Sequence, residues 1–271
     1  FQPSSFLYLP LLKSFGSSPL PIVNIGDPVC KYQLIAKRVE GLASNLHSPV
    51  SGLVHDIKSV LQADGQECLT IIIKNDFQET EVNHNVLDIN SLDEGGLIDL
   101  IEKAGIVGEG GAQFPTDIKY KVGDVNIKTF IVNGTECEPY LTSDYALMSE
   151  RTGKLFAGIN LIKSILKAEE VVISIEEQNK ELQSFFKPFL KQEKYSDIRI
   201  VVLPNEYPQG GELQLIRSVT GIEMPRRMRP RDIGVIVSNI GTICAVHDAI
   251  ETQRPVISRI LGREVGMLWK F

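Results

Sequence analysis

The sequence has few of the features that would place a protein in a membrane or on nucleic acid. No apolar run approaches the roughly 18 residues that a membrane-spanning helix needs. The first residues show no basic segment followed by a long apolar one, so no signal peptide is visible. The formal net charge is −6, whereas nucleic-acid binding requires a basic face. We therefore expect no transmembrane segment of its own and no nucleic-acid partner.

Cysteine is scarce, and its four positions, Cys30, Cys68, Cys137 and Cys244, form no C-x-x-C pair. A disulfide framework is not expected in a chain of 271 residues. The local ligand spacing of a zinc or iron–sulfur site is also absent. This usage fits the reducing cytosol, and it predicts no metal-binding residues in this chain.

The chain is long enough for two domains. Residues 1–80 indicate a β-rich domain, because short strand patterns alternate with Gly and Pro turns. The strand patterns are 33–36, 68–74 and 22–29, the last of which alternates and then turns at Gly26-Asp27-Pro28. In 47–54 a turn leads into a further strand. The pattern indicates a small barrel or sandwich and resembles lipoyl and biotinyl domains, which carry a lysine on an exposed hairpin. The matching segment 41–46 has no lysine, so a structural or docking role is favoured over a carrier role.

A polar stretch, 76–91, separates this part from a second pattern in which strands alternate with helices over residues 92–260. Alternation of this kind is typical of βαβ units, so we expect an α/β domain with a mostly parallel sheet. The predicted strands are 129–132, 171–175, 198–203 and 233–237. The predicted helices are 94–105, 143–167 (with Thr142 or Ser143 as N-cap), 177–192 (interrupted at Pro188), 211–220 and 241–252.

Four glycines, Gly105, Gly108, Gly110 and Gly111, follow the first of these helices within seven positions. Glycine offers no side chain to a core, so we expect this segment to serve a ligand rather than packing. Its bare backbone lets N–H groups approach a phosphate or a flat ring. The segment fits neither the dinucleotide fingerprint nor the Walker A loop, and a mobile surface loop stays the alternative interpretation.

Three further polar loops follow predicted strands and are expected to meet the glycine segment at one edge of the sheet. They are 133–144, 207–212 and 238–242. Glu136 and Glu138 lie in the first, and Lys119 lies one helical turn beyond the glycines. Carboxylates, an amide and an ammonium beside a glycine loop predict a nucleotide-type cofactor. Four arginines between 226 and 231 indicate either a solvated loop or a contact with an anion.

Taken together, these segments resemble the C subunit of the Rnf electron-transport complex, with similar loops in the FMN- and NADH-binding subunit of respiratory complex I. The resemblance spans nearly the whole chain in the same order. The matching segments are 23–27, 47–52, 108–116, 133–144, 207–212 and 239–242.

The resemblance implies an NADH-dependent flavoprotein oxidoreductase that holds FMN noncovalently and accepts hydride from NADH. Electrons would leave through iron–sulfur carriers to ferredoxin or another redox protein. The partners would be the other subunits of a membrane-bound electron-transport complex, with this subunit peripheral on the cytoplasmic face. The flavin performs the redox chemistry, so no side chain is expected to act as a catalytic acid or base.

The resemblance also assigns site residues. The expected FMN-binding residues are Gly108, Gly110, Gly111, Lys119, Asn133, Tyr207, Gly210, Gly211, Asn239 and Thr242. The expected NADH-binding residues are Phe114, Glu138 and Glu212.

Two departures from the family pattern stand out. Gln113 occupies the position of a fourth loop glycine, and the cysteine-rich iron–sulfur module is absent from this chain. The chain also lacks an initiator Met, so we expect it to be part of a longer protein. Two alternatives remain: a soluble relative that feeds a cobalamin or amino-acid reductase, and a non-catalytic quinone-binding subunit with an eroded flavin site. The retained glycines, Lys119 and Asn133 favour the flavin.

Overall fold

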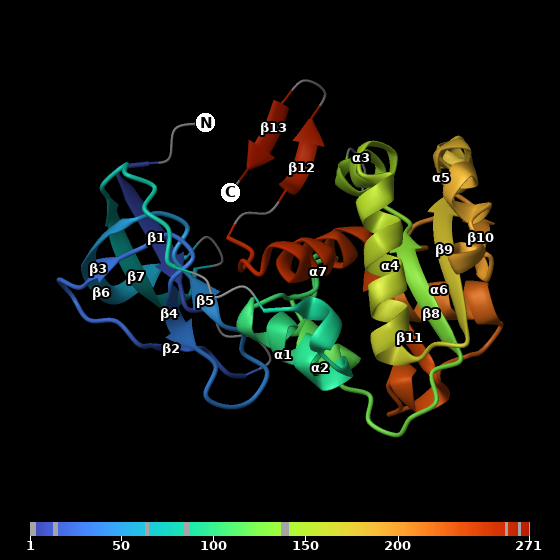
Figure 1. Ribbon diagram of the computed structural model, residues 1–271, viewed down its shortest axis with the longest axis horizontal. Coiled ribbons are helices and arrows are strands. Elements are labelled where there is room, and N and C mark those ends of the chain that lie inside the picture. Colours follow the sequence, from blue (N-terminus) through green and yellow to red (C-terminus); the bar gives the residue numbers. More distant parts are fainter. Residues whose placement is uncertain are drawn as a thin grey trace.

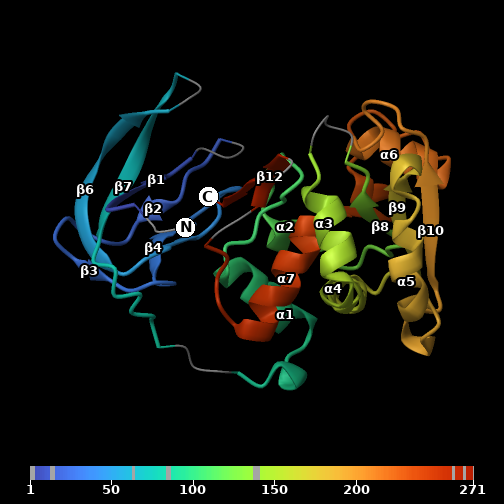
Figure 2. The same ribbon diagram turned by 90° about the horizontal axis from the view of Figure 1, so that it is seen from above.

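The computed structural model describes residues 4–12, 16–62, 65–83, 87–136, 141–257, 260–264 and 267–270. A β-rich unit (4–75, here the barrel unit) and an α/β unit (94–252) lie next to each other, with helices between the barrel and the parallel sheet (Figures 1 and 2).

Two antiparallel sheets form the barrel unit. In the larger sheet the strand order is β1-β7-β6-β3, and in the smaller it is β2-β4-β5. Their bounds are β1 Phe6–Pro10, β2 Leu20–Pro21, β3 Pro28–Val29, β4 Leu34–Lys37, β5 Leu46–His47, β6 Gly52–Leu61 and β7 Glu67–Asn75. Side chains such as Ile35, Val54, Ile71 and Ile73 are almost fully buried and make a separate hydrophobic core. The predicted β-rich barrel-sandwich is therefore confirmed.

The alternating segment that begins at Ile22 is not paired as a strand, because β3 comprises only Pro28–Val29. The turn predicted at the end of this segment is present, over residues 24–27. Asn24 and Asp27 close this turn. The backbone N–H of Asn24 donates to the Asp27 carboxylate at 2.7 Å, and the N–H of Asp27 donates to the Asn24 carbonyl at 3.1 Å. A side chain that hydrogen-bonds its neighbouring backbone competes with strand pairing.

The α/β unit has a four-stranded parallel sheet in the order β10-β9-β8-β11. The strands are β8 Thr129–Gly134, β9 Glu170–Glu176, β10 Ile198–Leu203 and β11 Val235–Asn239. Their nearly continuous apolar sequences suit a sheet covered on both faces. The predicted parallel α/β sheet is confirmed.

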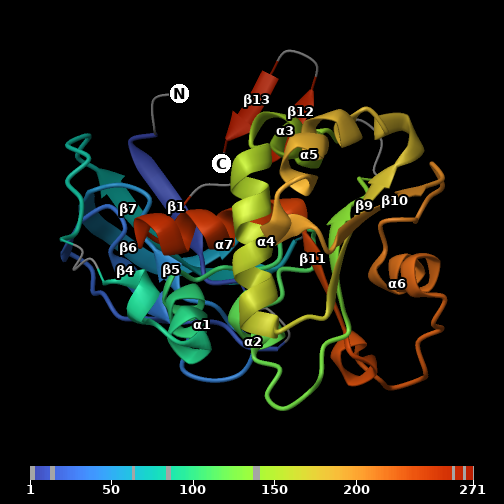
Figure 3. The same ribbon diagram turned by 45° about the vertical axis from the view of Figure 1, so that its right-hand side comes forward.

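Helices cover the two faces unequally. The core between the sheet and α1, α3, α4, α5 and α7 holds the largest buried side chains, including Phe156 and Phe186. On the opposite face α6 packs over Ile131 and Val237 (Figure 3). The bounds are α1 Glu94–Lys103, α2 Thr116–Tyr120, α3 Ser143–Glu150, α4 Thr152–Leu166, α5 Leu182–Leu190, α6 Glu212–Thr220 and α7 Ile240–Thr252.

Two predicted helices need correction. The single helix over 143–167 is two helices, α3 and α4, separated at Arg151, whose φ of −124° departs from helical geometry. The helix over 177–192 begins only at Leu182, after a short 3-10 turn at Glu177–Asn179. Pro188 lies inside α5 two residues before its end, so it removes one late hydrogen bond and does not interrupt the helix.

After α7, strands β12 Ile260–Glu264 and β13 Met267–Lys270 form an antiparallel pair. None of the helices within the described ranges combines the length and the apolar character needed to cross a membrane.

Candidate functional site

The order of connections creates a crevice at the carboxyl edge of the sheet. The chain passes from β8 outward to β9 and β10 and then returns to β11 on the other side of β8. The segments that leave β8 and β11 lead to α3 and α7 on the same face of the sheet. They begin side by side where the strand order reverses, which is the place where open α/β sheets bind ligands. Asn133 and Asn239 are register partners on these two strands, so both lie at this switch point.

Gly105 is a packing residue, contrary to the expectation that all four loop glycines serve a ligand. It follows α1 with a φ of +68°, and the N–H of Ile106 reaches back to the Ile101 carbonyl, as in a Schellman cap. A Cβ added at Gly105 would lie 2.3 Å from the carbonyl oxygen of Asn45 in the barrel unit. Glycine is needed here for the helix end and for close contact with the barrel.

The rest of the segment forms a closed loop whose crown faces outward. Its stem is fixed by hydrogen bonds from the Gly108 N–H to the Phe114 carbonyl (2.9 Å) and from the Thr116 N–H to the Ile106 carbonyl (3.0 Å). Gly110, Gly111 and Ala112 are exposed, and their backbone amides donate to no acceptor among the described residues. Three consecutive unused amides are the kind of donor set that binds an anion.

The loop crown requires positive φ angles at two positions. Gly111 has a φ of +94°, and a Cβ added there would meet no atom within 4 Å. Gln113 has a φ of +51°, which glutamine adopts at a steric cost that glycine avoids. The backbone at 113 thus keeps the conformation of the glycine that the resemblance predicts there.

One side of the crevice is formed by the carboxyl end of β8, by the start of α6 with the loop before it, and by α2. The Asn133 amide donates to the Gly210 carbonyl at 2.9 Å and ties the 207–212 loop to β8. The Lys119 ammonium donates to the Val237 carbonyl at 2.9 Å and pairs with Glu212 at 3.2 Å. An ammonium has three N–H donors, so Lys119 retains one for a ligand. These five residues come from four segments that are far apart in the sequence, and the structure brings them together.

The other side is formed by the start of α7. The Asn239 side-chain oxygen caps this helix, accepting from the N–H groups of Gly241 (2.8 Å) and Thr242 (3.4 Å). The Thr242 hydroxyl oxygen accepts from the Glu109 N–H at 2.9 Å. A Cβ added at Gly110 would lie 3.4 Å from the Asn239 Cβ. The glycine loop therefore rests directly on the end of β11.

The remaining predicted residues lie around this crevice with different exposure. Tyr207 is 76% exposed. Gly211 immediately precedes α6, and its N–H donates to the Pro208 carbonyl at 2.8 Å. Phe114 is half-buried in the loop stem, and Glu138 lies outside the described residues. The arginines between 226 and 231 lie on the segment that joins α6 to β11.

Glu136 has a structural role that sequence reasoning missed. Its carboxylate accepts from the Ser143 hydroxyl (2.9 Å) and from the N–H groups of Asp144 (3.2 Å) and Tyr145 (3.4 Å). It therefore caps α3, whereas the side chains predicted as N-caps do not. A negative charge at a helix N-terminus is favourable.

Asp144 is a second residue that was not singled out, although it ends the 133–144 motif. Burial raises the pKa of its carboxyl group to about 7, the nearby Glu136 charge adds to the increase, and the hydrogen bond from the Asn239 amide opposes it. The sequence did contain a signal that could have pointed to Asp144, because it is an acidic residue in the first turn of a helix that follows an apolar strand.

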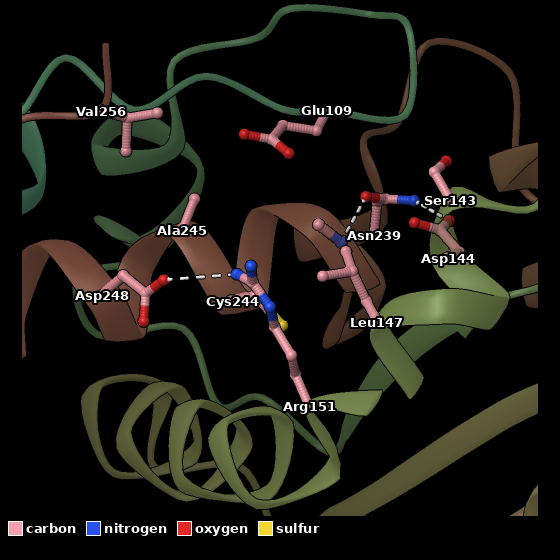
Figure 4. A pocket seen from close by; sticks show the side chains of 11 residues that line it. Glu109, Ser143, Asp144, Leu147, Arg151, Asn239, Cys244, Ala245, Asp248 and Val256 are labelled. Atoms are coloured by element: carbon pink, nitrogen blue, oxygen red, sulfur yellow. Dashed lines mark hydrogen bonds and ion pairs between the residues drawn. The ribbon is translucent and has the colours of Figure 1, made fainter. Parts of the chain in front are cut away.

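A cavity of about 130 Å³ lies between α3, α7 and the glycine loop, and Figure 4 shows the side chains that line it. Glu109, Asp144 and Asn239 line its upper part in this view, and Arg151 and Asp248 form an ion pair at 3.9 Å below them. Burial raises the pKa of the Cys244 thiol to about 12, so this thiol stays protonated at neutral pH and is not a nucleophile.

Both units of the chain are similar to known protein families. The family model of the RnfC barrel sandwich hybrid domain matches residues 1–78, and that of the Nuo51 FMN-binding domain matches residues 101–248. The chain belongs to the RnfC family. The resemblance inferred from the motifs is thus confirmed.

Curated relatives agree with this assignment. The C subunit of the proton-translocating ferredoxin:NAD(+) oxidoreductase complex of Clostridium ljungdahlii is 36% identical over 258 residues, which cover 94% of this chain and 56% of that protein. The C subunit of the ion-translocating oxidoreductase complex of Pseudomonas aeruginosa is 40% identical over 265 residues, covering 96% of this chain and 34% of that protein. This RnfC chain therefore spans about half or less of the length of these relatives.

A solved structure shows the same fold. A chain of the NAD+-reducing [NiFe]-hydrogenase in its H2-reduced state aligns with a TM-score of 0.53 at 24% identity. The alignment covers 59% of this RnfC chain and 31% of the hydrogenase chain, and the likeness concerns the fold alone.

Proposed function

We propose that this RnfC chain binds FMN at the switch-point crevice and accepts hydride from NADH on it. The observation that carries the proposal is the set of unused amides at Gly110, Gly111 and Ala112, on a loop that rests on the end of β11. The matched family model, an FMN-binding domain, covers this region.

The residues present fit a flavin nucleotide. The loop amides provide donors for a phosphate and bare backbone for a flat ring. Lys119 keeps one N–H for the ligand, and Lys119 and Asn133 both bind the 207–212 loop, through Glu212 and Gly210. When bound, FMN would supply the ability to accept a hydride and release single electrons.

The protein's own residues would bind and orient the cofactor and the dinucleotide. Gly108, Gly110 and Gly111 would face the flavin, and Lys119 and Asn133 would hydrogen-bond to its ring. Asn239 and Thr242 would complete the pocket by holding the loop on α7. Tyr207, Gly210 and Gly211 would cover the flavin from the α6 side. Phe114, Glu138 and Glu212 would contact NADH.

The wider role follows from the relatives. The Clostridium ljungdahlii protein is named a subunit of a ferredoxin:NAD(+) oxidoreductase complex. We infer that this chain works with the other subunits of such a membrane-bound complex, on its cytoplasmic face. Electrons would pass to iron–sulfur carriers outside this chain and then to ferredoxin or another redox protein.

Titration of FMN fluorescence with the apoprotein tests the proposal. We expect saturable quenching at one FMN per chain. Gly111→Val should abolish it, because a β-branched residue does not tolerate the φ of +94° found at this position, so the loop crown and its amides would have to move. Gly123→Val is the matched control, since Gly123 also has a positive φ (+64°) and open space around an added Cβ. Unchanged fluorescence with the wild-type protein would favour the non-catalytic alternative with an eroded flavin site.

A further inference from the structure

The barrel unit contacts the α/β unit at both ends of the glycine loop. Arg38 directly follows β4, and its guanidinium donates to both carboxylate oxygens of Asp117 on α2, at 3.2 and 2.6 Å. The same guanidinium pairs with Glu102 near the end of α1 at 2.9 Å. The side chains of Arg38 and Asp117 are 12% and 8% exposed, so water screens this pair little.

A second barrel residue, Asn45, reinforces the contact at the first end of the loop. Its side-chain amide donates to the Glu102 carbonyl at 3.0 Å, and its side-chain oxygen accepts from the Arg38 N–H at 3.0 Å. Its backbone carbonyl lies against Gly105 so closely that no Cβ fits. Asn45 and Arg38 thus form one connected polar group facing the loop.

These contacts lie where they constrain the loop most. Gly105 precedes the loop and Asp117 follows it, and Val107 pairs with Pro115 across the stem. Asp117 also lies two residues before Lys119 on α2. Movement at either end would therefore shift both the loop amides and the ammonium.

We propose that Arg38 is a positioning residue of the flavin site, through which the barrel unit holds the glycine loop and α2 in the geometry that binds the cofactor. A bidentate arginine–carboxylate pair fixes orientation as well as distance. A loop held in its binding conformation beforehand loses less conformational freedom on binding. The effect on flavin rests on the proposed function, whereas the effect on the loop does not.

The chain contains a matched control for simple docking of the two units. Arg254, beyond α7, pairs with Glu81 at 2.6 Å, and its guanidinium lies 5.3 Å from the Tyr32 ring centroid. This ion pair also joins the region after the α/β unit to the barrel side, but it touches neither α2 nor the glycine loop. If Arg38 only docked the barrel, loss of Arg254 would have a similar effect.

Hydrogen–deuterium exchange of the FMN-free protein tests the proposal without relying on flavin. In Arg38→Ala we expect exchange of the hydrogen-bonded amides of Gly108, Thr116 and Lys119, within residues 106–120, to accelerate by about tenfold or more, because the closed state of the loop loses its support. Arg254→Ala should leave this segment as in the wild type. Arg38→Lys should restore protection only in part, since lysine cannot make the bidentate contact.

A double variant excludes failure through a buried unpaired charge. Arg38→Ala alone would leave the buried Asp117 carboxylate without its partner, and adding Asp117→Asn removes that charge. The double variant should fold and show the same fast exchange. Where FMN binds, its dissociation constant should rise by about tenfold in the Arg38 variants alone.

The possible outcomes separate the two proposals. Fast loop exchange in the Arg38 variants, together with no FMN binding by the wild type, would leave the positioning role intact and refute the proposed function. Wild-type exchange in the Arg38 variants, or equal acceleration in Arg254→Ala, would overturn the positioning role.

Discussion

The barrel unit and the α/β unit bury different kinds of polar group. Among the described residues, the buried polar side chains of the barrel carry no carboxylate. They are His47, Ser48, Ser51, Thr70 and Asn75. The α/β unit buries four carboxylates: Asp117, Glu136, Asp144 and Glu176. Burial of an ionisable group is costly unless it is paired or neutralised.

The placement of these carboxylates explains the difference. Glu136 follows β8, Glu176 ends β9, and Asp144 begins α3, all toward the carboxyl edge of the sheet. Asp117 is neutralised by Arg38 from the barrel. A carboxyl group with a strongly raised pKa, such as that of Asp144, is typical of functional sites. The comparison therefore supports our proposal that the site lies in the α/β unit and that the barrel has a supporting role.

The largest expected effect tests whether the two units have independent cores. Phe156 is fully buried in the α/β core, with its ring stacked on Phe189 at 4.8 Å. Phe156→Ala should lower the free energy of unfolding of the α/β unit by about 3–5 kcal/mol. Urea denaturation measures the loss, and hydrogen exchange should show β6 and β7 still protected. The control Phe185→Ala, at a side chain that is 43% exposed, should change stability little. Equal loss of protection in both units would mean one shared core.

The second test uses the pH dependence of stability. The folded-state pKa of Asp144 is about 7, above its ordinary value near 3.8. The protonated carboxyl therefore favours the folded state, and this contribution is complete below about pH 4 and is lost as the pH rises through 7. The slope is at most about 1.4 kcal/mol per pH unit. Asp144→Asn should flatten this part of the pH profile measured by thermal denaturation.

Asp76, which directly follows β7 of the barrel unit, should show a pH dependence of stability with the opposite sign. The Ser51 hydroxyl donates to its carboxylate at 2.6 Å and holds the pKa of Asp76 below its usual value. Its contribution is therefore present above about pH 4 and is lost as the pH falls through the lowered pKa. Asp76→Asn should reduce stability at neutral pH and leave the slope between pH 4 and 7 as it is in the wild type. The same sign for both variants would contradict the contrast between the units.

A third prediction concerns binding. Lys119→Ala removes a charged donor from the crevice and should weaken FMN binding by about 1.5–3 kcal/mol. Lys121→Ala is the control, because Lys121 lies at the exposed end of the same short helix. Fluorescence titration compares the two. Equal affinity of Lys119→Ala and the wild type would remove Lys119 from the site.

The smallest effect is expected at Gln113. Gln113→Gly relieves the cost of a positive φ, but glycine also loses more entropy on folding, so stability should stay within about 1 kcal/mol of the wild type. Reduction of bound FMN by NADH should become faster, by less than about tenfold. Gln113→Ala keeps the backbone strain while removing most of the side chain, so stopped-flow rates of the three proteins separate the two causes. A slower Gln113→Gly would show that the glutamine contributes to the site.

Local pattern was enough to predict the parallel sheet and most of its helices, because apolar strands and amphipathic helices carry their own periodicity. It failed at Arg151, where two helices meet without Pro or Gly to mark the break. It also failed at the start of 22–29, where alternation predicted a strand, although the turn predicted after it does form between Asn24 and Asp27.

The sequence predicted which loops form the site. It did not predict the side-chain contacts that hold these loops in place. Arg38 and Asp117 are 79 residues apart, and Asn239 and Asp144 are 95 apart. No local spacing reports such pairs. Gly105 has the same appearance as the ligand-facing glycines in the sequence, and only its contact with Asn45 shows its different role.

The central claim is that this RnfC chain accepts hydride from NADH on bound FMN. The most direct test is the visible absorption spectrum of the FMN-loaded protein under anaerobic conditions, before and after one equivalent of NADH. We predict that the absorption band of oxidised flavin disappears, and that Gly111→Val, mixed with the same FMN and NADH, keeps it. A band of bound oxidised flavin that survives NADH in the wild-type protein would contradict the claim.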